Sequence, residues 1–245
     1  MPTSSQKAEV KVGFFDIETA PYLGWVWEKY ETNVIEFESG GYLLCFSVKW
    51  LGKEKIETYS LPEYSKTSDD SALVKKLWEF MNEADIIIAH NGDGFDVKKS
   101  NERFLVAGLT PPEPYKTIDT LKVARKHFRF PSNKLDELAK DLGIGRKLAH
   151  TGFKLWKDCI DRNKKAWLIM RRYNRQDVLL LEKLYLRLRP WITQHPNFNL
   201  YTLKDGCPRC GSHEIQRRGI EYSQKQKYKR IFCTQCRGWS RGEKL

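Results

Sequence analysis

Long apolar runs are absent from this chain of 245 residues. None approaches the roughly 20 apolar residues that a membrane-spanning helix needs, and the polar segment 1–7 lacks the apolar core of a secretory signal. The sequence also has no internal repeat and no low-complexity tract. We therefore expect a cytoplasmic protein that is not embedded in a membrane.

Cysteine is scarce before residue 200, where Cys45 and Cys159 are the only two of the six. Both stand in segments that favour a buried strand or helix, so we expect them to be small core residues. Acidic residues are scarce in the tail: residues 201–245 carry 11 Lys or Arg against 4 Asp or Glu, a surplus of 7 within a net charge of +12. Such a surplus suggests a polyanionic partner, although a basic surface can also serve solubility alone.

Hydrophobic periodicity predicts strands first and helices later, as in an α/β domain with a mixed sheet. Strands are expected at 10–17, in a hairpin of 42–50 with 55–60, at 85–90 and at 117–120. Helices are expected at 71–84, 95–107 and 165–188, with one capped by Ser132 or Asn133 and a less regular one within 151–165. The aromatic-rich connection after Thr19 has no predicted shape. We expect a flexible stretch 1–9, a domain over 10–191 and a small unit over 200–245.

Two carboxylates lie two residues apart in the first strand, at Asp16 and Glu18. Because side chains alternate along a strand, both emerge on one face. Two like charges at the edge of a core are costly unless a cation lies between them, and hard oxygen ligands suit Mg²⁺ or Mn²⁺. The alternative is that one carboxylate is solvated and the other caps a turn.

Two further segments carry candidate partners for this pair. Asn91, Phe95 and Asp96 follow the buried strand 85–90, where α/β sheets place their ligands; Asp96 could instead cap the next helix, and Asp93 is a rival ligand better suited to a turn. Tyr173 and Asp177 are four residues apart in the last helix, so they share a face. Taken alone, this second pair would be an ordinary exposed helix face.

Together these residues resemble the DEDD superfamily of 3′–5′ exonucleases in its tyrosine-bearing variant. The resemblance covers Asp16-x-Glu18, Asn91-x-x-x-Phe95-Asp96 and Tyr173-x-x-x-Asp177. It implies a ribonuclease H-like mixed sheet flanked by helices. It also implies that Asp119, on a strand common in the superfamily, is structural rather than a fifth ligand.

The resemblance implies phosphodiester hydrolysis with two Mg²⁺ or Mn²⁺ ions. Asp16 would bridge the ions, Glu18 and Asp177 would complete one site, and Asp96 would act through the second ion or its waters. Because a tyrosine with a pKa near 10 is a poor base at neutral pH, Tyr173 would orient the attacking water. The substrate expected is single-stranded nucleic acid with a free 3′ end, with DNA favoured over RNA.

Four cysteines form two Cys-x-x-Cys pairs separated by 22 residues: Cys207 with Cys210 and Cys233 with Cys236. This spacing is typical of a structural zinc site in a zinc ribbon, and two disulfides or a redox-active pair fit a basic cytosolic tail poorly. His213 is expected to be a bystander, because four thiolates already complete the site.

Basic and aromatic side chains alternate through the tail, which is a pattern suited to phosphates and bases of a single strand. The candidate contacts are Asn91, Arg217, Arg218, Lys227, Tyr228, Lys229, Arg230 and Trp239. A ribbon that docks a protein is the alternative. For the whole chain, the alternative to an enzyme is a nucleic-acid-binding or adaptor protein that keeps a nuclease fold without turnover.

Overall fold

The computed structural model describes residues 9–30, 33–202 and 205–245. Its centre is a five-stranded sheet in the order β5-β4-β1-β6-β7. The strands are β1 (Val12–Thr19), β4 (Leu43–Trp50), β5 (Ile56–Ser60), β6 (Ile86–Ala89) and β7 (Lys116–Asp119). β1 pairs antiparallel with β4 and parallel with β6. The expected mixed sheet is confirmed, although the first strand begins two residues later than predicted.

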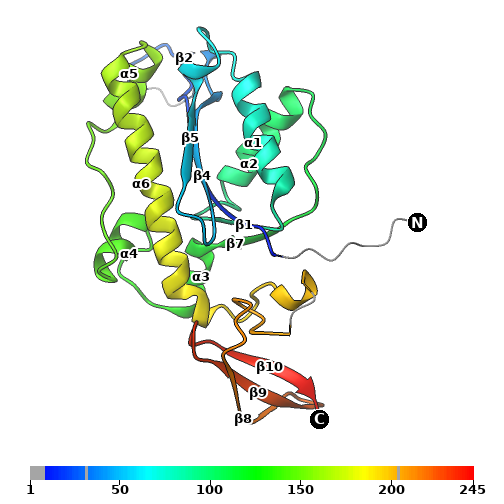
Figure 1. The fold of residues 1–245 in the computed structure, drawn as a ribbon. Helices are drawn as coiled ribbons and strands as arrows, with labels where there is room; N and C mark the ends of the chain where they lie inside the picture. The colour runs from blue at the N-terminus through cyan, green and yellow to red at the C-terminus, as the bar shows by residue number, and fades with distance from the viewer. Residues whose placement is uncertain (1–8, 31–32, 203–204) are drawn as a thin grey trace.

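Helices cover both faces of the sheet (Figure 1). α1 (Ser71–Glu83) and α2 (Asp96–Val106) lie on one side, and the long α6 (Lys164–Leu188) crosses the other. Phe14 and Phe15 are fully buried and point to opposite faces, so Phe14 packs in the cluster that includes Tyr185 of α6 while Phe15 packs with Leu77 of α1. Asp16 and Glu18 are two and four residues after Phe14 in the same strand, so their side chains lie on the same face of the sheet and point toward α6.

Three shorter helices connect the sheet to α6. They are α3 (Thr120–His127), α4 (Leu135–Asp141) and α5 (Phe153–Ile160). The N-cap of α4 is Lys134, so neither expected cap is right; Ser132 Oγ instead accepts the Lys134 N–H at 3.3 Å. The helical stretch expected over 151–165 ends at Ile160, because Arg162 takes a positive φ of 60° and Asn163 caps α6 as a new helix. Cys45 and Cys159 are buried, as expected.

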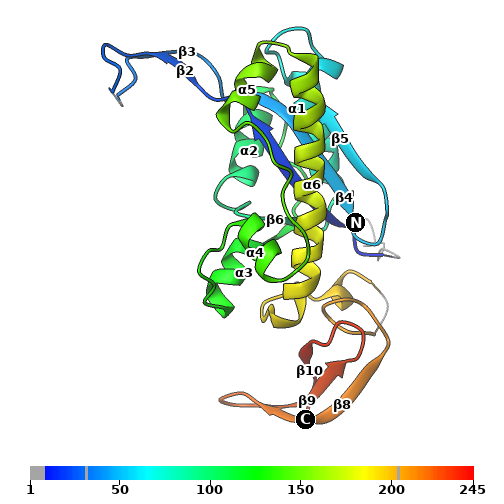
Figure 2. The ribbon, with the colours of Figure 1, turned by 90° about the vertical axis from the view of Figure 1, so that its left-hand side faces the viewer.

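The aromatic connection after β1 folds into a two-stranded arm of β2 (Leu23–Trp25) and β3 (Glu36–Ser39). The arm leaves the body at the end opposite the C-terminal strands (Figure 2). Its apolar side chains are exposed, with Trp27 and Tyr30 both at 87%. Burial alone therefore could not have predicted this element.

The C-terminal unit is a three-stranded antiparallel sheet of β8 (Ile215–Tyr222), β9 (Lys227–Cys233) and β10 (Trp239–Lys244). It follows α6 through the 3-10 turns η2 (Arg189–Trp191) and η3 (Phe198–Leu200), and it lies beyond the C-terminal end of α6 (Figures 1 and 2). A third such turn, η1 (Leu61–Glu63), follows β5. Among the described helices, none combines the length and apolarity needed to cross a membrane.

Candidate active site and zinc cluster

Three carboxylates converge where α6 crosses the centre of the sheet. Asp16 and Glu18 project from β1, opposite Ser47 and Cys45 of β4, and Asp177 projects from α6. The ligand oxygens of Asp16, Glu18 and Asp177 lie within 4.8 Å of one another. The structure therefore brings together residues 16, 18 and 177, which the sequence separates by about 160 positions.

Asp96 approaches this cluster from the N-terminus of α2. Its Oδ1 accepts the backbone N–H of Ile17, between the two acids of β1, at 3.3 Å. It is buried but is not one of the three clustered ligands. Burial together with the charge of Asp119 raises the pKa of Asp96 to about 7, although backbone donors oppose the shift.

The clustered acids all resist ionisation when no cation is present. Burial and then repulsion from Asp96 and Asp177 raise the pKa of Asp16 above its usual range. Burial and the charge of Asp177 raise the pKa of Glu18 to about 8. Burial also raises the pKa of Asp177, against the opposing effect of Lys147. A divalent cation would remove this penalty.

One oxygen of the cluster has no hydrogen-bond partner among the described residues. Asp177 Oδ1 is buried and has no hydrogen-bond donor in the described part of the chain. A buried carboxylate oxygen without a donor is costly, and a metal ion can satisfy it. The all-oxygen donor set of Asp16, Glu18 and Asp177 fits Mg²⁺ or Mn²⁺.

Tyr173 lies beside Asp177 on the same face of α6, as expected from their spacing. Its ring packs edge-on against His150, with centroids 4.7 Å apart, and against Trp156 at 6.1 Å. Burial and the neighbouring Asp177 raise the pKa of Tyr173 above its usual range. The phenol is therefore protonated at neutral pH and available as a hydrogen-bond donor.

Two residues of this site were not predicted from the sequence. The first is Asn174, which is fully buried and donates from Nδ2 to the Asp16 carboxylate at 2.7 Å and to the Asp16 carbonyl at 3.1 Å. The amide holds the Asp16 side chain in place. Its position next to Tyr173 was the sequence feature that could have indicated a role in the site. It was not selected, because Asn174 does not lie on the helix face shared by Tyr173 and Asp177.

The second is Lys147, from the loop between α4 and α5. Its Nζ lies 2.5 Å from Asp177 Oδ2 and 3.1 Å from the Tyr173 hydroxyl. Burial lowers the pKa of Lys147, but the charges of Asp177 and its neighbours outweigh this effect and raise the pKa above its usual value. Lys147 thus provides a fixed positive charge within the acidic cluster.

The loop that carries Lys147 is held at two points. Asp136 of α4 accepts the Lys147 backbone N–H at 2.7 Å and pairs with Arg146 at 2.8 Å. Gln176 of α6 donates to the Arg146 carbonyl at 3.0 Å. These contacts, and not a local sequence pattern, place the lysine.

A cleft of about 900 Å³ opens in front of these groups, lined by Asp16, Lys147 and Tyr173. Asn91 also lines it, so this candidate contact lies beside the acids, whereas Phe95 is 44% exposed at the start of α2. Asp119 accepts backbone N–H groups of Asn91 and of the first turn of α3, a structural role. Asp93 pairs with Lys122 at 2.7 Å, away from the cluster.

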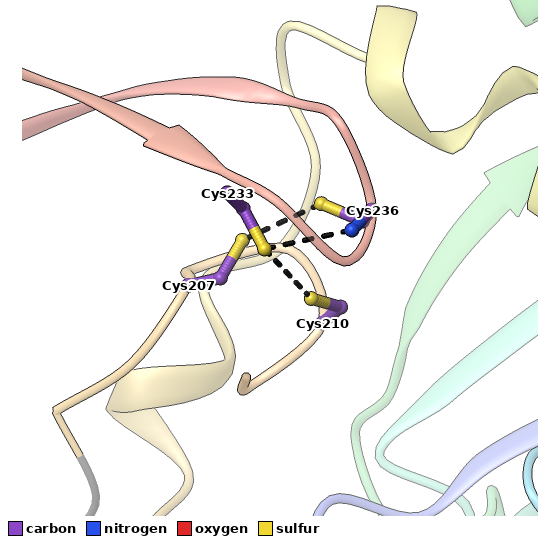
Figure 3. Close-up of side chains that lie close together, drawn as sticks. All are labelled: Cys207, Cys210, Cys233 and Cys236. Atoms are coloured by element: carbon purple, nitrogen blue, oxygen red, sulfur yellow. Dashed lines mark hydrogen bonds between the residues drawn. The ribbon is translucent and has the colours of Figure 1, made fainter. Parts of the chain in front are cut away.

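The four tail cysteines form a second cluster, in which all sulfur atoms lie within 4.8 Å of one another (Figure 3). The Sγ atoms of Cys207 and Cys236 are 3.6 Å apart, and those of Cys210 and Cys233 are 3.7 Å apart. Four sulfurs about 2.3 Å from a tetrahedral zinc would be roughly 3.8 Å apart. The cluster fits zinc and is too open for disulfides. His213 lies outside it, with Nδ1 near the Asp205 carbonyl.

The candidate nucleic-acid contacts of the tail divide between the two faces of the ribbon sheet. Cross-strand pairing puts Tyr228, Arg230 and Trp239 on one face, and Arg218 joins them through its contact with the Phe232 ring. Arg217, Lys227 and Lys229 lie on the opposite face. The sequence indicated the residue types but not this division.

Comparison with known proteins identifies the larger domain. A family model described as the RNase H superfamily matches residues 13–189, so the chain belongs to the RNase H superfamily. Among solved structures, the chain is similar to the family B DNA polymerase from the hyperthermophilic archaeon Pyrobaculum calidifontis, with a TM-score of 0.56 and 17% identity. The match covers 90% of this chain but only 32% of that polymerase. Among curated proteins, none matches this sequence.

Proposed function

We propose that this protein is a metal-dependent 3′–5′ exonuclease that hydrolyses single-stranded nucleic acid, with DNA favoured over RNA. The observation that carries the proposal is the convergence of Asp16, Glu18 and Asp177 within 4.8 Å, beside the protonated Tyr173. Membership of the RNase H superfamily supports a nuclease. The similarity to a DNA polymerase supports the preference for DNA.

The acids would hold two Mg²⁺ or Mn²⁺ ions. Asp16, Glu18 and Asp177 suit one site, whereas Asp16 with Asp96 suits the second. When bound, the ions lower the pKa of the attacking water and stabilise the leaving 3′ oxygen. Asn174 keeps the Asp16 carboxylate oriented for this purpose.

Tyr173 would orient the attacking water by a hydrogen bond, because its raised pKa excludes it as a base at neutral pH. Lys147 holds the Tyr173 hydroxyl and offsets the negative charge of Asp177. Its positive charge would also stabilise the negative charge that develops on the phosphate during hydrolysis.

The cysteine cluster would hold one structural zinc ion. A unit of about 45 residues builds little apolar core, so metal binding supplies much of its folding free energy. The ribbon would add basic and aromatic groups for the nucleic acid, outside the catalytic centre.

The direction and substrate are tested by incubating the protein with single strands of DNA or RNA labelled at the 3′ or the 5′ end. In Mg²⁺ or Mn²⁺, we expect the 3′ label to leave at once as mononucleotide and the 5′ label to remain on a shortening ladder. EDTA should stop both. Release of the 5′ label first, or internal cuts alone, would contradict the proposed direction.

The competing function is a nucleic-acid-binding or adaptor protein without turnover. The convergence of Asp16, Glu18 and Asp177 beside Tyr173, with Asp96 bound to the backbone between the two acids of β1, favours the enzyme. Binding of both labelled strands without any cleavage in Mg²⁺ or Mn²⁺ would favour the adaptor.

A further inference from the structure

A cleft of about 620 Å³ lies between the nuclease domain and the ribbon, with a tryptophan from each. Trp191 belongs to η2 and is 58% exposed, and Trp239 begins β10 and is 42% exposed. Large aromatic surfaces left in water at the same hollow mark a binding surface. Neither tryptophan has a role in the catalytic site.

Direct contacts between the domains hold this cleft in shape. Arg209 of the ribbon donates to the Trp239 carbonyl at 2.7 Å and to the Arg189 carbonyl at 3.3 Å, and it also contacts the Pro190 carbonyl. The backbone N–H of Phe198 donates to the Pro208 carbonyl at 2.8 Å. The tryptophans are therefore presented by a preformed surface.

From this cleft, one face of the ribbon continues as alternating rings and guanidinium groups. The rings of Phe232 and Trp239 are 4.9 Å apart, with Arg218 lying 4.9 Å from the first and Arg230 lying 5.0 Å from the second. Arg241 follows, 5.3 Å from the Tyr228 ring, but it pairs with Glu221 at 2.6 Å, so Arg218 and Arg230 are the cations proposed to contact phosphates. Rings that stack with bases, beside cations that contact phosphates, favour single-stranded nucleic acid as the occupant.

The helix α3 connects this cleft to the catalytic one. Arg125 lines the catalytic cleft, His127 lines the interdomain cleft, and the exposed Lys126 lies between them in the sequence. Figure 2 shows α3 at the side of the body nearest the ribbon. Arg125 and His127 are two residues apart, or about 3 Å along the helix axis, so a strand that follows α3 can pass from one cleft to the other.

We propose that a single strand whose 3′ end occupies the catalytic cleft runs along α3 and enters the interdomain cleft, where Trp191 and Trp239 stack on its bases. The strand then continues over the ribbon face that carries Arg218 and Arg230. The inference rests on the proposed function only for the position of the 3′ end.

The test measures binding of fluorescent oligothymidylates by anisotropy in buffer that contains neither Mg²⁺, Mn²⁺ nor a chelator, so that cleavage does not enter and the ribbon keeps its zinc. Trp191→Ala or Trp239→Ala should weaken binding of a strand of about 12 nucleotides by tenfold or more. A strand of about four nucleotides, which is short enough to be held within one cleft, should lose less affinity in either variant. Trp191→Phe should restore binding of the longer strand, because a ring is retained.

Two adjacent arginines on opposite faces provide a matched control for charge. Arg218→Glu should weaken binding of the longer strand, whereas Arg217→Glu should have a much smaller effect. If Arg218→Glu and Arg217→Glu weakened binding equally, the ribbon would attract the strand only through its net charge, and the proposed route would be wrong. The route would also be wrong if Trp191→Ala and Trp239→Ala both had normal melting temperatures and bound the longer strand with unchanged affinity. The proposed exonuclease activity is tested separately, because a protein that does not cleave could still show these differences in binding affinity.

Discussion

The side-chain amide of Asn174 lies 2.7 Å from the carboxylate of Asp16, joining the middle of α6 to the central strand β1. Asn174 is fully buried, and its Nδ2 also donates a hydrogen bond to the backbone carbonyl of Asp16. This pair links the packing of the helix to the orientation of a proposed metal ligand.

Asn174→Ala should therefore raise the concentration of Mn²⁺ needed for half-maximal cleavage. Loss of a group that orients a ligand typically reduces metal affinity or activity by about 10- to 100-fold. Metal titrations of cleavage rate measure the shift, with the exposed Asn101→Ala as control. If Asn174→Ala folded normally and needed the same concentration of Mn²⁺ as the unchanged protein, Asn174 would not position the metal ligand.

Lys147→Met should lower turnover on the order of 10²-fold, because it removes the fixed positive charge that we propose stabilises the reacting phosphate. Single-turnover cleavage with saturating metal isolates this effect from binding. Lys154→Met, which removes an exposed lysine of α5, should cleave normally. If Lys147→Met cleaved as fast as the unchanged protein, the role of the lysine would be limited to pairing with Asp177 when no metal is bound.

The metal-free protein should lose thermal stability as pH rises. The pKa values of Asp96 and Glu18 in the folded protein are about 7 and 8, whereas unfolded acids titrate near 4. Protonation therefore favours the folded state fully below about pH 4, and this contribution disappears as pH rises through 7 and 8.

Melting temperatures between about pH 5 and 9, in buffer without Mg²⁺, Mn²⁺ or a chelator so that the ribbon keeps its zinc, test this dependence. Asp16→Asn should flatten the fall, because it removes one of the repelling charges, and Mg²⁺ or Mn²⁺ should restore stability at high pH. If the melting temperature of the unchanged protein rose with pH relative to that of Asp16→Asn under these conditions, the proposed repulsion within the cluster would be contradicted.

The sequence could predict the elements whose signals are local. Alternation along β1 put Asp16 and Glu18 on one face, and helical spacing put Tyr173 with Asp177. Periodicity alone did not make them one site, because that expectation came from the resemblance to the exonuclease superfamily. The positions of the main-sheet strands along the chain and the mixed type of the sheet were also predicted, because buried strands and helices differ in period.

The remainder depended on contacts between distant segments. Lys147 reaches the acids because Asp136 and Gln176 hold its loop, and nothing near Lys147 in the sequence encodes that position. The arm of β2 and β3 exposes the aromatic residues that usually indicate a core, so a prediction from burial failed there. The division of the ribbon cations between two faces required the strand register.

The cysteine cluster should retain about one zinc ion per chain after dialysis against magnesium buffer. Metal analysis of the purified protein measures it. Changing Cys207, Cys210, Cys233 and Cys236 to serine should remove the zinc, whereas Cys45→Ser with Cys159→Ser should not. Zinc that stayed bound without the four ribbon cysteines would refute the assignment.

The central claim is that Asp16 and Asp177 hold the metal ions that hydrolyse the nucleic acid. It is tested most directly by following 5′-labelled single-stranded DNA in Mn²⁺ with the unchanged protein, Asp16→Asn, Asp177→Asn and the exposed control Asp141→Asn. We predict a ladder shortening from the 3′ end for the unchanged protein and Asp141→Asn, and an intact strand for the two cluster variants at unchanged binding affinity. Near-normal shortening by Asp16→Asn or Asp177→Asn would contradict the account.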